Sequence, residues 1–203
     1  MNAFETLHHI VPAAVTFFLV TNPIGNSPAI LALIKNFDFQ RQRIIMLREG
    51  FLALLVALFF QYLGEPFLSL LAVKNYSVTL CGGLILFLVA LRMIFSLSEP
   101  NESEALQQEP FLVPIATPLL SGPGLLTMIM LKSHLESSHL IISLSILLAW
   151  VGVLAVMIIA PYLQRLLGIK GMLALEQLMG LLLAMIGLEM LVNGVKLYMD
   201  TLG

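Results

Sequence analysis

The chain has few charged residues. Only 11% of its 203 residues are Asp, Glu, Lys or Arg, whereas 59% are hydrophobic and the mean hydropathy is +0.98. A water-soluble domain is typically about 25% charged, so this sequence lacks the polar residues that would cover a globule in water. Lipid must therefore solvate its surface. A membrane helix takes roughly 20 apolar residues, and we expect one membrane domain over residues 1–203 with no separate soluble domain.

Other scarcities exclude further classes of protein. Cys81 is the single cysteine, so no intramolecular disulfide can form. The net charge is −2 and no basic cluster follows the pattern of a phosphate contact surface, so we expect no nucleic-acid partner. No Walker pattern is present for a nucleotide, and the histidines are not spaced like metal ligands. We expect no cofactor, no metal site and no enzymatic activity.

Six apolar segments follow one another along the chain. They cover about residues 7–34, 46–63, 76–95, 111–131, 140–160 and 173–195. An acidic stretch at about 97–109 separates the third segment from the fourth, and it divides the chain into a first half of about 1–96 and a second half of about 110–203. The predicted fold class is therefore an all-α membrane protein with six transmembrane helices, three in each half.

The first and fourth segments are interrupted in the same way. The first contains N-P-I-G-N-S-P at 22–28 and the fourth contains T-P-L-L-S-G-P-G at 117–124. Proline removes a backbone donor, and glycine lets the backbone leave helical dihedral angles. Polar backbone groups released inside a bilayer must find other partners, so such sequences persist where they face protein or a wet cavity. Interrupted segments at matching places in two halves are typical of a transporter's binding site.

Weak sequence matches run in the same order through both halves. Pro23 matches Pro123 at an offset of 100, and residues 66–68 match 161–163 at an offset of 95. Residues 82–94 match 179–191 at an offset of 97, with five identities in thirteen positions. Because each half has an odd number of spans, the halves must insert in opposite orientations. The pattern predicts two inverted-topology repeats, each with its first helix broken.

The two interruptions together resemble the paired signatures of the MarC family of prokaryotic membrane proteins. The residues that carry the resemblance are N-P-I-G-N-S-P at 22–28 and P-L-L-S-G-P-G at 118–124. The family typically has aspartate or asparagine before Pro23, and this chain has Asn22. The resemblance covers essentially the whole chain. It implies a multi-pass protein of the bacterial cell inner membrane, and its SnatA-like members transport small neutral amino acids such as glycine and alanine.

The chemistry of broken helices suits such a cargo. The N-terminus of a half-helix offers unpaired N–H groups to a carboxylate, and a C-terminus offers carbonyls to an ammonium group or a sodium ion. We expect the second half-helix of the first segment to begin near 25–27, with Pro28 in its first turn. A competing interpretation is that these residues only kink helices that pack closely. Ten residues are candidate substrate contacts: Asn22, Pro23, Gly25, Asn26, Ser27, Ser121, Gly122, Pro123, Gly124 and Thr127.

Four charged residues lie inside or beside the apolar segments. Glu49 and Glu189 are candidates for ion coupling, although Glu49 also suits the start of a helix. Arg92 occupies the repeat position that corresponds to Glu189, and it suits a side chain that extends to the membrane interface. Glu176 suits an interfacial position at the start of the sixth segment.

The predicted function is secondary transport of small neutral amino acids by alternating access around the two broken helices, with sodium ions or protons as candidate coupling ions. Alternatives that keep the same fold are a channel or exporter for another small solute and a non-transporting accessory subunit. The sequence does not specify an oligomeric state. Basic residues favour the cytoplasmic side of a membrane. If both termini are periplasmic, seven of the ten lysine and arginine residues lie on the cytoplasmic side. These seven are Lys35, Arg41, Arg43, Arg48, Arg92, Arg165 and Lys170.

Overall fold

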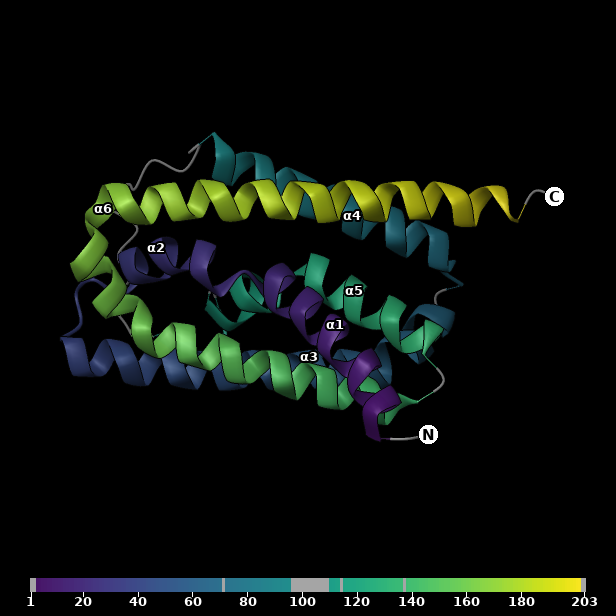
Figure 1. The fold of residues 1–203 in the computed structure, drawn as a ribbon, viewed down its shortest axis with the longest axis horizontal. Coiled ribbons are helices and arrows are strands. Elements are labelled where there is room, and N and C mark those ends of the chain that lie inside the picture. Colours follow the sequence, from purple (N-terminus) through teal and green to yellow (C-terminus); the bar gives the residue numbers. More distant parts are fainter. Residues whose placement is uncertain (1–2, 71, 96–109, 114, 137, 202–203) are drawn as a thin grey trace.

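In the computed structural model, described for residues 3–70, 72–95, 110–113, 115–136 and 138–201, the regular elements are helices. Figure 1 shows them as a bundle of roughly antiparallel rods, with the start of the first helix and the end of the last at the same end of the view. The acidic stretch between the halves falls within 96–109, outside the described residues. In chain order the elements are α1 (Ala3–Thr21), α2 (Pro23–Leu33), α3 (Phe39–Leu70), α4 (Asn75–Ile94), η2 (Ile115–Leu120), α5 (Pro123–Leu135) and α6 (His139–Met199).

The first apolar segment is broken where the sequence predicts. Asn22 separates α1 from α2 with φ 50° and ψ 52°, the left-handed conformation that asparagine tolerates better than most residues. The predicted start of the second half-helix was wrong by two to four residues. Pro23 takes the first helical position, where its missing N–H has no partner to lose, and Pro28 lies inside α2.

The fourth segment is broken as well, and more extensively. The segment η2 has wide turns, with N–H groups donating five residues back from Thr117 to Leu112 and from Ser121 to Ala116. Thr117 leaves the helical region altogether. Gly122 is extended, and α5 begins at Pro123. Both breaks are therefore followed directly by a proline at the first position of the next helix.

Two predicted helix ends lie elsewhere. The apolar segments at about 46–63 and 140–160 end just before Pro66 and Pro161 in the sequence prediction, but both prolines lie inside longer helices, α3 and α6. The fifth segment ends instead at Gly168, whose φ of 66° and ψ of −178° are accessible essentially to glycine alone. The bend at Gly168 is the turn that α6 makes at the left of Figure 1. The last two apolar segments are thus joined without a loop.

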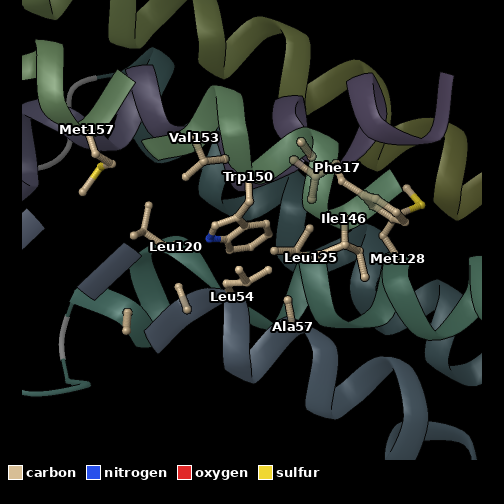
Figure 2. Packing of buried hydrophobic residues seen from close by; sticks show 14 of the residues in the cluster. Phe17, Leu54, Ala57, Leu120, Leu125, Met128, Ile146, Trp150, Val153 and Met157 are labelled. Atoms are coloured by element: carbon tan, nitrogen blue, oxygen red, sulfur yellow. The ribbon is translucent and has the colours of Figure 1, made fainter. Parts of the chain in front are cut away.

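Buried hydrophobic side chains from most of the helices meet around Trp150. Figure 2 shows its indole between Val153 and Leu54, with Leu120 of η2 nearby. The indole Nε1 donates to the carbonyl oxygen of Gly50 at 2.7 Å, so the polar atom of this large side chain is satisfied inside the core. This contact fixes α6 against α3 and against the second break.

Five helical stretches are long and apolar enough to cross a membrane, judged by length and composition among the described residues. They are Leu7–Leu33, Phe39–Gly64, Asn75–Ile94, His139–Gly168 and Lys170–Met199. The fourth expected span, at about 111–131, does not meet this criterion, because its break leaves α5 with only 13 residues. The arrangement of six spans as two inverted repeats stays a prediction.

Candidate functional site

The first break is closed by the side chain of Asn22. Its Oδ1 accepts a hydrogen bond from the backbone N–H of Gly25 at 3.1 Å, so the N-terminus of α2 is capped. Its Nδ2 lies 3.3 Å from the sulfur of Met93 on α4. A Cβ at Gly25 would collide with the amide of Asn22 and come within 2.5 Å of the Met93 methyl group. Glycine is thus required here by close packing.

The side chain of Asn26 joins the two breaks. Its Nδ2 donates to the carbonyl oxygen of Thr21 at 3.0 Å and to that of Leu119 at 2.7 Å. In an unbroken helix Thr21 would receive the N–H of Gly25, which here caps onto Asn22. Leu119 would receive the N–H of residue 123, which is a proline and has none. One amide therefore supplies the donors that two interruptions, 93 residues apart, take away.

The second break leaves a helix N-terminus without a side-chain cap. Gly122 precedes α5 and has no side chain to cap it, and among the described residues the first turn of that helix has no side-chain cap. Pro123 has no N–H, so Gly124 and Leu125 carry the first free backbone donors. A Cβ at Gly122 would lie 2.6 Å from the carbonyl oxygen of Pro118, which keeps this turn closed to larger residues.

A cavity of about 370 Å³, which we name the break cavity, lies between the two breaks. Both breaks line it, together with the C-terminal half of α4 and part of α6. Its volume is near the lower end of the range, about 300–1,000 Å³, for small-molecule sites. Most of its wall is apolar, with a few polar groups from the breaks. The Oδ1 atom of Asn26 accepts no hydrogen bond from the described residues, so it is available as an acceptor for a ligand.

Six of the ten candidate contacts line the break cavity, and four do not. The lining residues are Asn22, Gly25, Asn26, Gly122, Pro123 and Gly124. Ser27 donates to the carbonyl of Pro23, and Ser121 donates to the carbonyl of Ala53 at 2.7 Å, so both hydroxyls hold the breaks in place. The side chain of Thr127 packs against Gly82 of α4, in the space that a side chain at position 82 would occupy.

The two coupling candidates lie away from the cavity wall. Glu49 is fully buried in α3 and pairs with Arg48 at 3.1 Å. Its second oxygen, Oε2, has no hydrogen-bond partner among the described residues. Glu189 is on an exposed part of α6, where the side-chain amide of Asn193 donates to it at 3.2 Å. Neither residue lines the break cavity.

Two charged residues of the cavity wall were not among the sequence candidates. Arg92, in the last turn of α4, and Glu176 of α6 both line the break cavity. The sequence signal was present, since both charges interrupt apolar segments, but an interfacial position explained each of them equally well. In the part of the chain that is described, no group of three or more His, Cys, Asp or Glu side chains could hold a metal ion.

Comparison with known proteins gives a match to a family described as MarC family integral membrane protein, over residues 7–199. The UPF0056 inner membrane protein YhgN of Escherichia coli strain K12 is 41% identical over 197 residues, which cover 95% of this chain and 99% of that protein. The UPF0056 membrane protein of Buchnera aphidicola subsp. Schizaphis graminum is 39% identical over 94% of this chain and 97% of its own length. A UPF0056 membrane protein of Chlamydia trachomatis is 34% identical over 88% of this chain and 89% of its own. No solved structure matches.

Proposed function

The chain belongs to the MarC family of integral membrane proteins, and from this membership we propose that it is a secondary transporter of small neutral amino acids in the bacterial inner membrane. The observation that carries the proposal is the bond from Asn26 Nδ2 to the Leu119 carbonyl at 2.7 Å. It brings two interrupted helices to one cavity, which both of them line. Binding sites of secondary transporters are built in this way, at discontinuous helices.

The polar groups of the cavity match the two charged ends of a zwitterion. The uncapped N–H groups of Gly124 and Leu125, at the positive end of α5, suit a carboxylate. The Oδ1 of Asn26 suits an ammonium group. Gly122 and Gly124 let a ligand approach the backbone, and the modest volume favours a small side chain. Glycine and alanine fit this description.

Packing between α4 and the last part of α6 supports the inverted repeat. A Cβ on Gly83 would lie within 3.0 Å of Gly187, Met190 and Leu191. A Cβ on Gly180, the counterpart of Gly83 at an offset of 97, would meet α4 at the three positions that correspond to these: Ala90, Met93 and Ile94. Contacts that repeat when the two halves are exchanged are expected from a pseudo-twofold axis.

A second, much smaller hollow contains the repeat counterpart of a residue in the break cavity. It has a volume of about 10 Å³ and lies between α4 and α5, with Thr79 in its wall. Thr79 is the counterpart of Glu176, since the two are 97 residues apart and sit in the N-terminal turns of equivalent helices. In our proposal the halves exchange conformations, so that the large cavity closes and the small hollow opens on the other side.

Orientation and coupling belong to the same proposal. The relative in Escherichia coli is named an inner membrane protein, and the distribution of basic residues favours a periplasmic position for both termini. Glu49, buried with one unpartnered oxygen, is our candidate for proton coupling. Sodium is the competing coupling ion. The proposal includes no enzymatic step.

Uptake by purified protein in proteoliposomes tests the function. We expect saturable uptake of labelled alanine that is accelerated by unlabelled alanine inside, with a dependence on either a sodium or a proton gradient. A thermal-shift screen of the detergent-purified protein against free amino acids should give its largest stabilisation with glycine, alanine or serine. Flux that neither saturates nor shows counterflow would indicate a channel. Failure to bind or move any amino acid would leave the accessory-subunit alternative.

A further inference from the structure

Two residues of opposite charge line the break cavity. Arg92 of α4 is exposed and Glu176 of α6 is half-buried, and both line the same cavity. Neither has a hydrogen-bond or ion-pair partner among the described residues. The remaining lining residues are apolar or uncharged. The charge of the cavity wall is therefore set by these two residues and sums to zero.

The antiparallel packing of α4 and α6 places the two charges at the same level. A Cβ on Gly180 would lie 2.9 Å from Met93 and 3.1 Å from the carbonyl oxygen of Ala90. Glu176 precedes Gly180 by one helical turn, so it lies level with the last turn of α4, which carries Arg92. The first break is close by, because the amide of Asn22 contacts Met93.

The two acidic residues considered for ion coupling do not line the cavity. Glu49 is paired with Arg48, away from the cavity. Glu189, the repeat counterpart of Arg92, is exposed and bound by Asn193. Arg92 and Glu176 are thus the charges that a solute in the cavity meets. Since both lie in a wall that is otherwise mainly apolar, each gains most from a ligand that supplies the opposite charge.

We propose that Arg92 and Glu176 make the break cavity selective for zwitterions. Arg92 adds a positive charge for the carboxylate to the N–H groups of α5, and Glu176 adds a negative charge for the ammonium group to the Oδ1 of Asn26. The inference rests on the proposed transport function and names the residues that set its substrate class. An anion meets repulsion from Glu176 and a cation meets repulsion from Arg92, whereas a zwitterion satisfies both. Discrimination by unpaired repulsive charge is a common source of specificity.

Three ligands of nearly equal size test the charge rule. Alanine is a zwitterion, alaninamide carries only the ammonium charge, and lactate carries only the carboxylate charge. Binding to the full-length, detergent-purified protein is measured by isothermal calorimetry and by thermal shift. We expect wild type to bind alanine and to discriminate against the other two. Arg92→Gln should lower the affinity for alanine by about tenfold or more, because a charge-assisted contact to the carboxylate is lost. The same change should raise the affinity for alaninamide, because a repulsion of its ammonium group is removed. Glu176→Gln should lower the affinity for alanine similarly, and it should raise the affinity for lactate instead.

Matched controls remove one positive and one negative charge at positions outside the cavity. Lys170→Gln and Asp38→Asn change exposed residues and should leave all three affinities unchanged. The exchanged pair, Arg92→Glu with Glu176→Arg, restores a neutral wall and should recover part of the alanine binding that each single variant loses. Unfolding temperatures without ligand establish that the variants fold.

The outcomes separate this inference from the function on which it rests. If wild type binds alanine but both single variants keep its order of preference among the three ligands, the charge rule is wrong and the transport proposal stands. If wild type binds no amino acid, the transport proposal fails and the charge rule fails with it.

Discussion

The side-chain amide of Asn26 satisfies carbonyl oxygens from two distant parts of the chain. A carbonyl left without a donor in a low-dielectric setting is costly, at about 1–3 kcal/mol each. The same amide keeps the breaks at a fixed separation across the cavity. The hydrogen bonding of both breaks therefore depends on the amide group of Asn26, and the effect of replacing this residue on stability can be predicted.

We predict that Asn26→Ala lowers the free energy of unfolding by roughly 2–4 kcal/mol, because the carbonyls of Thr21 and Leu119 both lose a donor. Asn26→Asp should be worse than Asn26→Ala, since a carboxylate would face two carbonyl oxygens. Thermal unfolding in detergent measures the effect. Asn36→Ala, an exposed asparagine beyond α2, is the control. Equal unfolding temperatures for the Asn26 and Asn36 variants would contradict the assigned role.

The sequence predicts some of these residues and not their partners. Asn22 and Asn26 were candidates because amides beside proline and glycine can replace lost helix hydrogen bonds. That Asn26 reaches Leu119 depends on how the two halves pack, which local patterns do not contain. Arg92 and Glu176 were missed for a similar reason. Their shared cavity follows from the antiparallel register of α4 and α6, and the sequence alone is compatible with an interfacial position for each.

At the scale of the helices, glycine sets how closely α4 and α6 approach. A Cβ on Gly187 would lie 2.8 Å from the backbone nitrogen of Phe87 and 3.0 Å from the carbonyl oxygen of Gly83. Backbone atoms cannot move aside as the end of a side chain can. Contact between small residues is also a usual way in which membrane helices associate, because lipid tails give no hydrophobic drive between them.

We predict that Gly187→Ala destabilises the protein by about 1–3 kcal/mol through overpacking of this contact. The matched control is Gly50→Ala in α3, where the added methyl would meet only the end of the Leu154 side chain at 2.8 Å. Unfolding temperatures of the two variants, compared with wild type, provide the measurement. A smaller loss for Gly187→Ala than for Gly50→Ala would refute the interpretation.

Helix boundaries were predicted less well than helix breaks. Each break combines proline, glycine and polar side chains within a few residues, and all of these residue types favour an interruption of the helix. Pro66 and Pro161 stand alone in long apolar stretches, and their helices continue past them. In a membrane protein, neighbouring helices and local adjustments can satisfy the backbone that a single proline releases. Gly168 ends the fifth segment because of its backbone conformation, which the sequence does not specify.

For the whole molecule, the distribution of basic residues predicts the orientation in the membrane. We expect a cysteine at Asp200, near the end of α6, to react with a membrane-impermeant maleimide in intact cells. A cysteine at Asn36, between α2 and α3, should react only after the membrane is permeabilised. Both are introduced after Cys81→Ser, which removes the native thiol. The reverse labelling pattern would place both termini in the cytoplasm.

The bond between Asn26 and Leu119 also bears on the order in which the protein is made. The two residues are 93 positions apart, and ribosomes add about 5–20 residues per second. The amide of Asn26 is thus synthesised about 5–20 s before the carbonyl that it will bind. When the second half of the chain is synthesised, the first half already contains the donor that the Leu119 carbonyl needs. The second break can therefore form its hydrogen bond as soon as the two halves pack together.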